Sequence, residues 1–200
     1  MARTLAFDRE TVVRAALEVF WRAGYESASI PELERETGLS RSSIYNSFGS
    51  KRGLFDAAVQ LYLGDIIRPR LRPLLDADPD PQAITVYLEG LRTTLQRSDS
   101  LPALAGCLLI NTAGSPIADD PVVAETIAGY RGELQSAFRH GILARVPDLT
   151  PDAAERLASA CTGQVIAAFA LVRVSASEAA QAVTTALELI ASAQRQQTPG

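Results

Sequence analysis

The segment from Ser29 to Lys51 constrains the fold of this chain more than any other. It contains two short stretches of helical character, separated at Gly38. Glycine is favoured where a helix ends in a left-handed conformation, because it has no β-carbon to clash with the backbone. Ser29 with Glu32 forms a capping pair for the first stretch, and Ser40 can cap the second. The segment therefore predicts a helix-turn-helix.

The second of these helices has one apolar and one polar side. Ile44 and Phe48 stand four residues apart, so they share a side, and we expect that side to face the core. The other side carries hydroxyl, phenol, amide and guanidinium groups but no carboxylate: Arg41, Ser42, Ser43, Tyr45, Asn46 and Ser47. A surface of this kind can lie against phosphates and base edges.

The distribution of charge favours this interpretation. The whole chain carries a formal net charge of −4, which argues against non-specific binding to nucleic acid. Nevertheless, residues 37–55 contain no acid, although they include Arg41, Lys51 and Arg52. Lys51 is the single lysine of the chain and follows Ser50, a residue suited to cap a new helix, so it marks a candidate phosphate site. The alternative is an ordinary solvated pair of helices that binds no nucleic acid.

Residues 8–64 resemble the N-terminal domain of transcriptional regulators of the TetR/AcrR family. The resemblance rests on a Gly-Tyr pair at 24–25, a glycine turn at Gly38, and the Tyr-x-x-Phe-x-x-Lys spacing that ends at Lys51. Two positions depart from the family pattern: Glu36 stands where a small residue is usual, and Arg52 stands where an acid is usual.

The resemblance implies DNA contacts along the polar side of the second helix and its surroundings. We expect them from Ser29, Arg41, Ser42, Ser43, Tyr45, Asn46, Ser47, Lys51 and Arg52. In this scheme Lys51, Tyr45 and backbone amides near Ser29 hold phosphates and fix the register. Arg41, Ser42, Ser43 and Asn46 are the candidates for base edges, because arginine suits guanine and asparagine suits adenine.

Composition disfavours several other function classes. The chain has one histidine and two cysteines, Cys107 and Cys161, which is too few for most metal sites and catalytic triads. It has no phosphate-binding glycine loop and no metalloprotease motif. We therefore expect no metal, no cofactor and no enzyme activity. The scarcity of cysteine, together with the lack of a leader or of an apolar run of about 18 residues, predicts a cytoplasmic protein without a membrane segment.

Helical periodicity and turn residues predict an all-α chain of about nine helices. The expected order is a three-helix DNA-binding domain over residues 1–55, followed by a ligand-binding and dimerisation domain over residues 67–200. A connecting helix joins them, beginning at Lys51 and ending near residue 66, before Pro69 and Pro73. A single short helix is expected around residues 103–113.

The last two expected helices are rich in alanine and aliphatic residues on more than one side. Such helices need cover, either from their own body or from a partner. In the resembled family they pair with their counterparts in a four-helix interface, which implies a homodimer that reads a near-palindromic double-stranded operator. The alternative is a monomer that buries these helices in its own core.

The resemblance also implies an effector pocket between the middle helices. The expected lining residues are Tyr62, Tyr87, Leu91, Cys107, Leu108, Asn111, Thr112, Tyr130, Gln164 and Phe169, because such pockets combine apolar walls with a few polar groups. The leading hypothesis is a repressor released from DNA by an unknown small molecule. Two alternatives stay open: a thiol or electrophile sensor acting through Cys107, and a helical small-molecule binding protein that binds no operator.

Overall fold

A computed structural model describes residues 8–97 and 99–197, which form helices and loops without β-strands. The helices are α1 (Arg9–Ser27), α2 (Ile30–Thr37), α3 (Arg41–Phe48), α4 (Lys51–Leu61), η1 (Tyr62–Ile67), α5 (Arg68–Leu75), α6 (Ala83–Leu95), α7 (Leu101–Ala105), α8 (Leu108–Ala113), η2 (Pro116–Asp119), α9 (Pro121–Arg145), α10 (Pro151–Leu171) and α11 (Ala176–Gln197). Within the described ranges, nine α-helical units result if α4, η1 and α5 count as one helix and α7 with α8 as one interrupted unit. The all-α prediction is confirmed.

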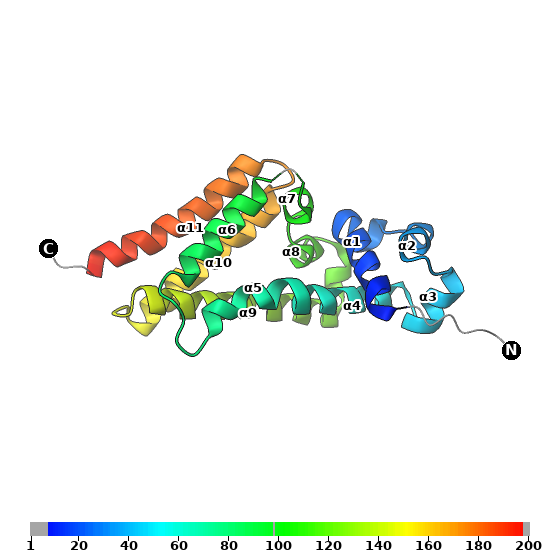
Figure 1. The fold of residues 1–200 in the computed structure, drawn as a ribbon, viewed down its shortest axis with the longest axis horizontal. Helices are drawn as coiled ribbons and strands as arrows, with labels where there is room; N and C mark the ends of the chain where they lie inside the picture. Colours follow the sequence, from blue (N-terminus) through cyan, green and yellow to red (C-terminus); the bar gives the residue numbers. More distant parts are fainter. Residues whose placement is uncertain (1–7, 98, 198–200) are drawn as a thin grey trace.

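The molecule is elongated, with α1, α2 and α3 at one end and the end of α11 at the other (Figure 1). We call α1 to α4 the head and the part from α5 onward the body. In the head, α1 packs against α2 and α4, and α3 packs against α4. In the body, α10 pairs with α11 and α9, while α5 lies along α9 and α6 lies along α11.

Helix α1 supplies the scaffold of the head. Its buried stripe includes Val13, Leu17 and Phe20 at helical spacing. The stripe ends at Gly24, whose φ of 78° breaks the helical backbone and turns the chain toward α2. A residue with a β-carbon would be strained in this conformation. Tyr25 follows and lies against Phe55 of α4, with ring centroids 5.1 Å apart, which fixes the corner that presents the helix-turn-helix.

The connecting helix is longer than the sequence predicts. The expected end before Pro69 is wrong, because the helix continues through a π-helical segment, η1, into α5 and runs to Leu75. In this segment the N–H of Arg68 bonds to the carbonyl of Leu63, five residues back instead of four. The wider turn just before Pro69 relaxes the clash and the missing donor that make proline a helix breaker. The head and the body therefore share one continuous rod (Figure 1).

The single short helix expected around residues 103–113 is also wrong, because Gly106 divides it into α7 and α8. Gly106 has φ 72° and ψ −139°, which ends α7 and starts α8 in a new direction. The space at this glycine is small: a β-carbon would lie 2.5 Å from the carbonyl oxygen of Phe169 in α10. The glycine therefore allows α10 to approach closely here as well as allowing the turn.

One stretch, Leu101–Asp119, is long and apolar enough by composition to cross a membrane, with a mean hydropathy of 1.4. The sequence expectation that no such run exists is therefore wrong on composition. In the fold, however, this stretch is not a continuous helix, because Gly106 interrupts it. A spanning helix must satisfy its backbone polar groups within itself. Here α7 and α8 instead pack against α1, and α8 also contacts α9 and α10.

Candidate functional site

The helix-turn-helix forms as its capping residues predict. The hydroxyl of Ser29 accepts a hydrogen bond from the N–H of Glu32 at 3.2 Å, and Gly38 adopts the left-handed conformation with φ 68°. The hydroxyl of Ser40 accepts a bond from the N–H of Ser43 at 3.3 Å and caps α3. These caps fix the angle between α2 and α3, and thereby the direction in which α3 points its polar side.

The polar side of α3 is open to solvent. Arg41, Ser42, Tyr45, Asn46 and Ser47 are exposed, whereas Ser43 is half-buried. The guanidinium of Arg41 lies 5.6 Å from the centre of the Tyr45 ring, a distance at which a cation and an aromatic face attract each other. The face therefore combines exposed donors with an aromatic ring, as the pattern of α3 predicts.

Sequence reasoning missed one residue at this face, Glu34 of α2. Its carboxylate accepts a hydrogen bond from the backbone N–H of Arg41 at 2.5 Å. Glu34 also lines a shallow hollow together with Ser40, Arg41, Ser42 and Tyr45. The acid-free run begins at Thr37, so Glu34 lies just outside it in sequence although it reaches the face in space. It joins α2 to the start of α3 and places one negative charge beside the exposed donors.

Lys51 and Arg52, adjacent in sequence, have different surroundings. The Nζ of Lys51 donates to the carbonyl of Glu26 at 3.3 Å and lies 4.6 Å from the centre of the Tyr25 ring. Partial burial lowers the pKa of this amine. Lys51 is the first residue of α4, whose N-terminus is capped by Ser50, so cation and helix dipole reinforce each other there.

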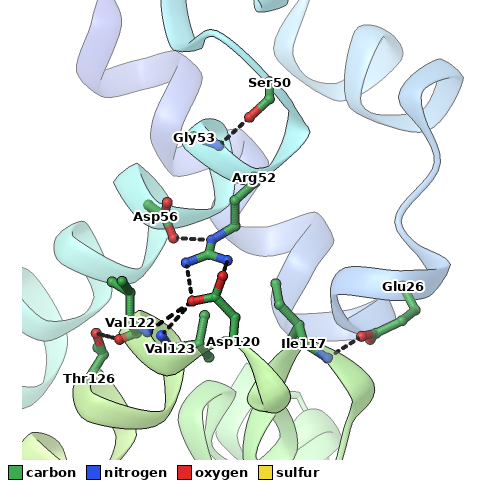
Figure 2. Close-up of polar contacts among 10 residues, drawn as sticks. All are labelled: Glu26, Ser50, Arg52, Gly53, Asp56, Ile117, Asp120, Val122, Val123 and Thr126. Carbon is green, nitrogen blue, oxygen red and sulfur yellow. Dashed lines mark hydrogen bonds and ion pairs between the residues drawn. The ribbon is translucent and has the colours of Figure 1, made fainter.

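Arg52 points toward Asp120 at the start of α9, in the body (Figure 2). Its guanidinium lies 2.7 Å from a carboxylate oxygen of Asp56 and 2.8 Å from one of Asp120, and the side chain is 24% exposed. Asp120 also caps α9 by accepting from the N–H groups of Val122 and Val123. The hydrogen bond from Arg52, followed by these backbone bonds, lowers the pKa of Asp120 to about 2. Arg52 thus links the start of the connecting helix to the start of α9.

A second contact joins the head to the same region of the body. The carboxylate of Glu26, just after the Gly24 corner, accepts a hydrogen bond from the backbone N–H of Ile117 at 2.9 Å (Figure 2). Ile117 belongs to η2, one turn before Asp120. Side chains from α1 and α4 therefore bind the η2–α9 corner at two neighbouring points. We call the two contacts, Glu26 with Ile117 and Arg52 with Asp120, the corner joint.

A cavity of about 300 Å³ lies where α1, the connecting helix, α6, α7 and α10 meet. Its lining consists of Trp21, Tyr62, Ile67, Arg70, Val86, Tyr87, Gly90, Leu91, Thr94, Pro102, Gly106 and Phe169. Among the residues expected to line a pocket, the structure brings Tyr62, Tyr87, Leu91 and Phe169 together here. The walls are mostly apolar or aromatic, as is typical of small-molecule sites.

The other six expected residues do not line this cavity. Cys107 and Tyr130 are buried behind Tyr62, whose hydroxyl donates to the Cys107 sulfur at 3.3 Å; that sulfur lies 3.6 Å from the Tyr130 hydroxyl. Asn111 donates to the carbonyl of Ala105, and Thr112 donates to that of Leu108, which is itself buried. Gln164 is half-buried on α10. The break at Gly106 changes the direction of the chain, which is why a single-helix pattern misplaces Cys107, Leu108, Asn111 and Thr112.

Trp21 connects this cavity to the head. Its indole N–H donates to the carbonyl oxygen of Gly106 at 2.9 Å, and its ring meets that of Tyr62 edge-on, with centroids 4.9 Å apart. The side chain of this tryptophan is buried, as is common for aromatic residues. It also forms part of the cavity wall. Arg70 also lines the cavity but was not expected there. The connecting helix was expected to end before Pro69, so the sequence pattern gave Arg70 no position on it.

Comparisons with known proteins agree with this geometry. The profile for bacterial regulatory proteins of the tetR family matches residues 12–58, which span most of α1 and run into α4. The uncharacterized HTH-type transcriptional regulator YezE of Bacillus subtilis is 33% identical over 144 residues, which cover 72% of each chain. This chain belongs to the TetR family.

Other known proteins show similarity along most of the chain. The HTH-type transcriptional repressor ComR of Escherichia coli is 27% identical over 126 residues, covering 62% of this chain and 59% of ComR. A solved structure of a cysteine mutant of the TetR family regulator CifR, complexed with 26-bp double-strand operator DNA, is 29% identical with a TM-score of 0.76. It covers 93% of this chain and 98% of that one. The TetR-family chain is thus a helix-turn-helix, DNA-binding transcriptional regulator.

Proposed function

We propose that this regulator is a homodimeric repressor that a small molecule releases from a near-palindromic operator. The observation that carries the proposal is the cavity at the joint of head and body, with Trp21 of the head in its wall. The relatives ComR and BdcR of Escherichia coli are named as repressors, which supports that sign of regulation. In the proposed division of labour, residues 1–55 read DNA and residues 67–200 bind the effector and a second subunit.

The proposed DNA contacts divide into two groups. Lys51, Tyr45 and the backbone near Ser29 contact phosphates, because the amine and the two helix N-termini present positive potential on one side. Arg41, Ser42 and Asn46 contact base edges, with Ser43 and Ser47 beside them. We leave Arg52 out of this set, since its guanidinium is already paired with Asp56 and Asp120.

The proposed dimer forms through α10 and α11. An outward row of small residues runs along α10 at spacings of three and four, comprising Ala160, Gly163, Ala167 and Ala170. Val174, just after this helix, is 86% exposed, and Leu171 is 38% exposed. Small residues allow two helix backbones to approach closely, and a twofold pairing would set two α3 helices about one DNA turn, roughly 34 Å, apart.

Release of the operator requires the effector to favour a state that cannot bind DNA. Tight binding alone shifts nothing, because only a difference in affinity between two states moves an equilibrium. In the proposed mechanism, a ligand in the cavity pushes on Trp21 and strains its bond to Gly106. The head then tilts on the connecting helix, and the separation of the two α3 helices in the dimer changes.

The DNA-binding part of the proposal is tested with the DNA upstream of the gene. We expect a salt-dependent mobility shift for the full chain. Lys51→Ala should weaken binding to all sequences about equally and reduce the salt slope by about 1, because one phosphate contact is lost. Arg41→Ala should weaken binding and also relax sequence preference. Arg72→Ala, an exposed arginine of α5 in the body, is the charge-matched control and should change neither.

The outcomes separate the candidate functions. If the chain shows no salt-dependent binding to its own upstream DNA, it is a small-molecule binding protein and not a repressor of that gene. If Arg41→Ala weakens every sequence equally, Arg41 contacts a phosphate and the assignment of base contacts on α3 must change.

A further inference from the structure

The cavity beside Trp21 has an unusual charge balance. Its lining residues include one guanidinium, that of Arg70, and no carboxylate among the residues that the structure describes. The chain as a whole is acidic, with a formal net charge of −4. A single cation in an otherwise apolar lining that includes no acid defines a chemical preference, because an anionic group on a ligand would find a partner there and a cationic group would be repelled.

The guanidinium of Arg70 is unpaired in the described part of the chain. Within residues 8–97 and 99–197 its guanidinium makes no ion pair and no hydrogen bond, whereas Arg68, two residues earlier on α5, holds both oxygens of Glu133 with bonds of 3.2 and 2.9 Å. Arg70 is exposed at the rim, so it can reach an incoming ligand without first breaking an internal pair. An arginine also suits a carboxylate geometrically, because its fork of N–H groups matches two oxygens.

Tyr87 supplies a second free donor in the same cavity. Its ring packs edge-on against Phe138, with centroids 5.4 Å apart, and its hydroxyl has no hydrogen-bond partner in the described part of the chain. Burial raises the pKa of this phenol, so it keeps its proton and can donate. The hydroxyl of Tyr62, by contrast, already donates to Cys107. Two unpaired donors therefore accompany apolar walls.

We propose that this cavity binds a small organic acid that has one carboxylate on an aromatic or compact apolar body. In this arrangement Arg70 and Tyr87 donate to the carboxylate, and Trp21, Leu91 and Phe169 enclose the apolar part. The volume of about 300 Å³ is at the lower end for ligand sites, which fits a body of one ring or a short branched chain. The inference rests on the proposed effector response, since it names the class of effector.

The ligand class can be tested without DNA. Trp21 is the only tryptophan of the chain, so its fluorescence reports on the cavity wall. We would titrate the full chain with 3-phenylpropionate, with the neutral 3-phenylpropionamide and with the cationic 3-phenylpropylamine, following Trp21 emission and the heat of binding. The acid should bind at least about tenfold more tightly than the amide, because the charge-assisted bonds to Arg70 are lost with the amide. The amine should bind weakest.

Variants sharpen the test. Arg70→Ala should weaken the acid about tenfold and leave the amide unchanged, while Tyr87→Phe should weaken it severalfold. Arg72→Ala, also exposed on α5 but outside the cavity lining, is the control and should bind the acid normally. Three results would each overturn the proposal: equal affinity for the acid and the amide, an Arg70→Ala variant that binds the acid as tightly as the wild type, or no binding of 3-phenylpropionate at 10 mM. Operator binding without ligand is measured separately, so failure of the repressor proposal and failure of the ligand class remain distinguishable.

Discussion

At the scale of single residues, the conformation of Gly106 and the reactivity of Cys107 are set by the groups packed around them. Gly106 combines a positive φ, a carbonyl that accepts from Trp21, and a neighbouring helix, α10, that leaves no space for a β-carbon. Cys107, the next residue, is fully buried between the hydroxyls of Tyr62 and Tyr130. Both residues lie at the head–body junction, and both give sharp predictions.

Gly106→Ala should destabilise the fold by about 2–4 kcal/mol. The left-handed backbone is costly for alanine, and the new methyl group would collide with the carbonyl oxygen of Phe169. Gly129→Ala is the control, since Gly129 is an exposed position of α9 with open space around it, and alanine there should add about 0.5–1 kcal/mol. Urea unfolding measures both. If Gly106→Ala leaves the free energy of unfolding unchanged, α7 and α10 can move apart freely.

Cys107 should not react with iodoacetamide in the native protein. Its side chain is 0% exposed, as is that of Cys161, where burial also raises the thiol pKa to about 12. We expect both cysteines to be labelled only after unfolding, with peptide mass spectrometry to assign the sites. Rapid native labelling of Cys107 but not Cys161 would instead favour a sensor of electrophiles that reach Cys107 through the cavity.

At the scale of elements, the corner joint makes the stability of the molecule depend on pH. The folded state lowers the pKa of Asp120 to about 2, mainly through the hydrogen bond from Arg52. A carboxylate with a lowered pKa stabilises the fold above its unfolded pKa of about 4, and this contribution is lost as the pH falls from about 4 toward 2. Asp120→Asn should therefore lower the melting temperature at pH 6 and flatten its decline below pH 4.

Asp119→Asn, at the neighbouring exposed acid of η2, is the control for this experiment. Asp119 makes no ion pair with any residue in the described ranges, so its substitution should leave the acid limb of the stability curve unchanged. If Asp120→Asn follows the wild-type curve at every pH, the pair with Arg52 contributes nothing to folding in solution.

The elements also show what the sequence could and could not predict. The helix-turn-helix followed from local chemistry: the caps Ser29 and Ser40 and the left-handed Gly38 act within a few residues of their own positions. The course of the connecting helix beyond Pro69 could not be predicted in this way. It depends on the π-helical segment, which has no simple residue signature. The prediction of the pocket lining was the least accurate, because the lining comes from five helices that are distant in sequence and could not be assigned by periodicity.

At the scale of the whole molecule, the row of small residues on α10 gives a test of the dimer. Gly163→Glu should convert a dimer into a monomer of 21.4 kDa and abolish tight operator binding, because the new carboxylate would enter the proposed interface. Gly132→Glu is the matched control: Gly132 is also an exposed helical glycine with open space, but on α9. Sedimentation equilibrium measures the mass. A Gly163→Glu variant that stays dimeric would place the interface elsewhere.

The π-helical segment between α4 and α5 has a consequence for how such a molecule can change its length. A π-turn holds one more residue per turn than an α-turn, so a residue can be added or lost there while the flanking helices keep their phase. Elsewhere along the rod, one residue would rotate the DNA-reading end by about 100° against the sensing end. Gly64, exposed and with open space around it, lies within this segment. The gain or loss of one residue within this segment would therefore leave the direction in which α3 points unchanged.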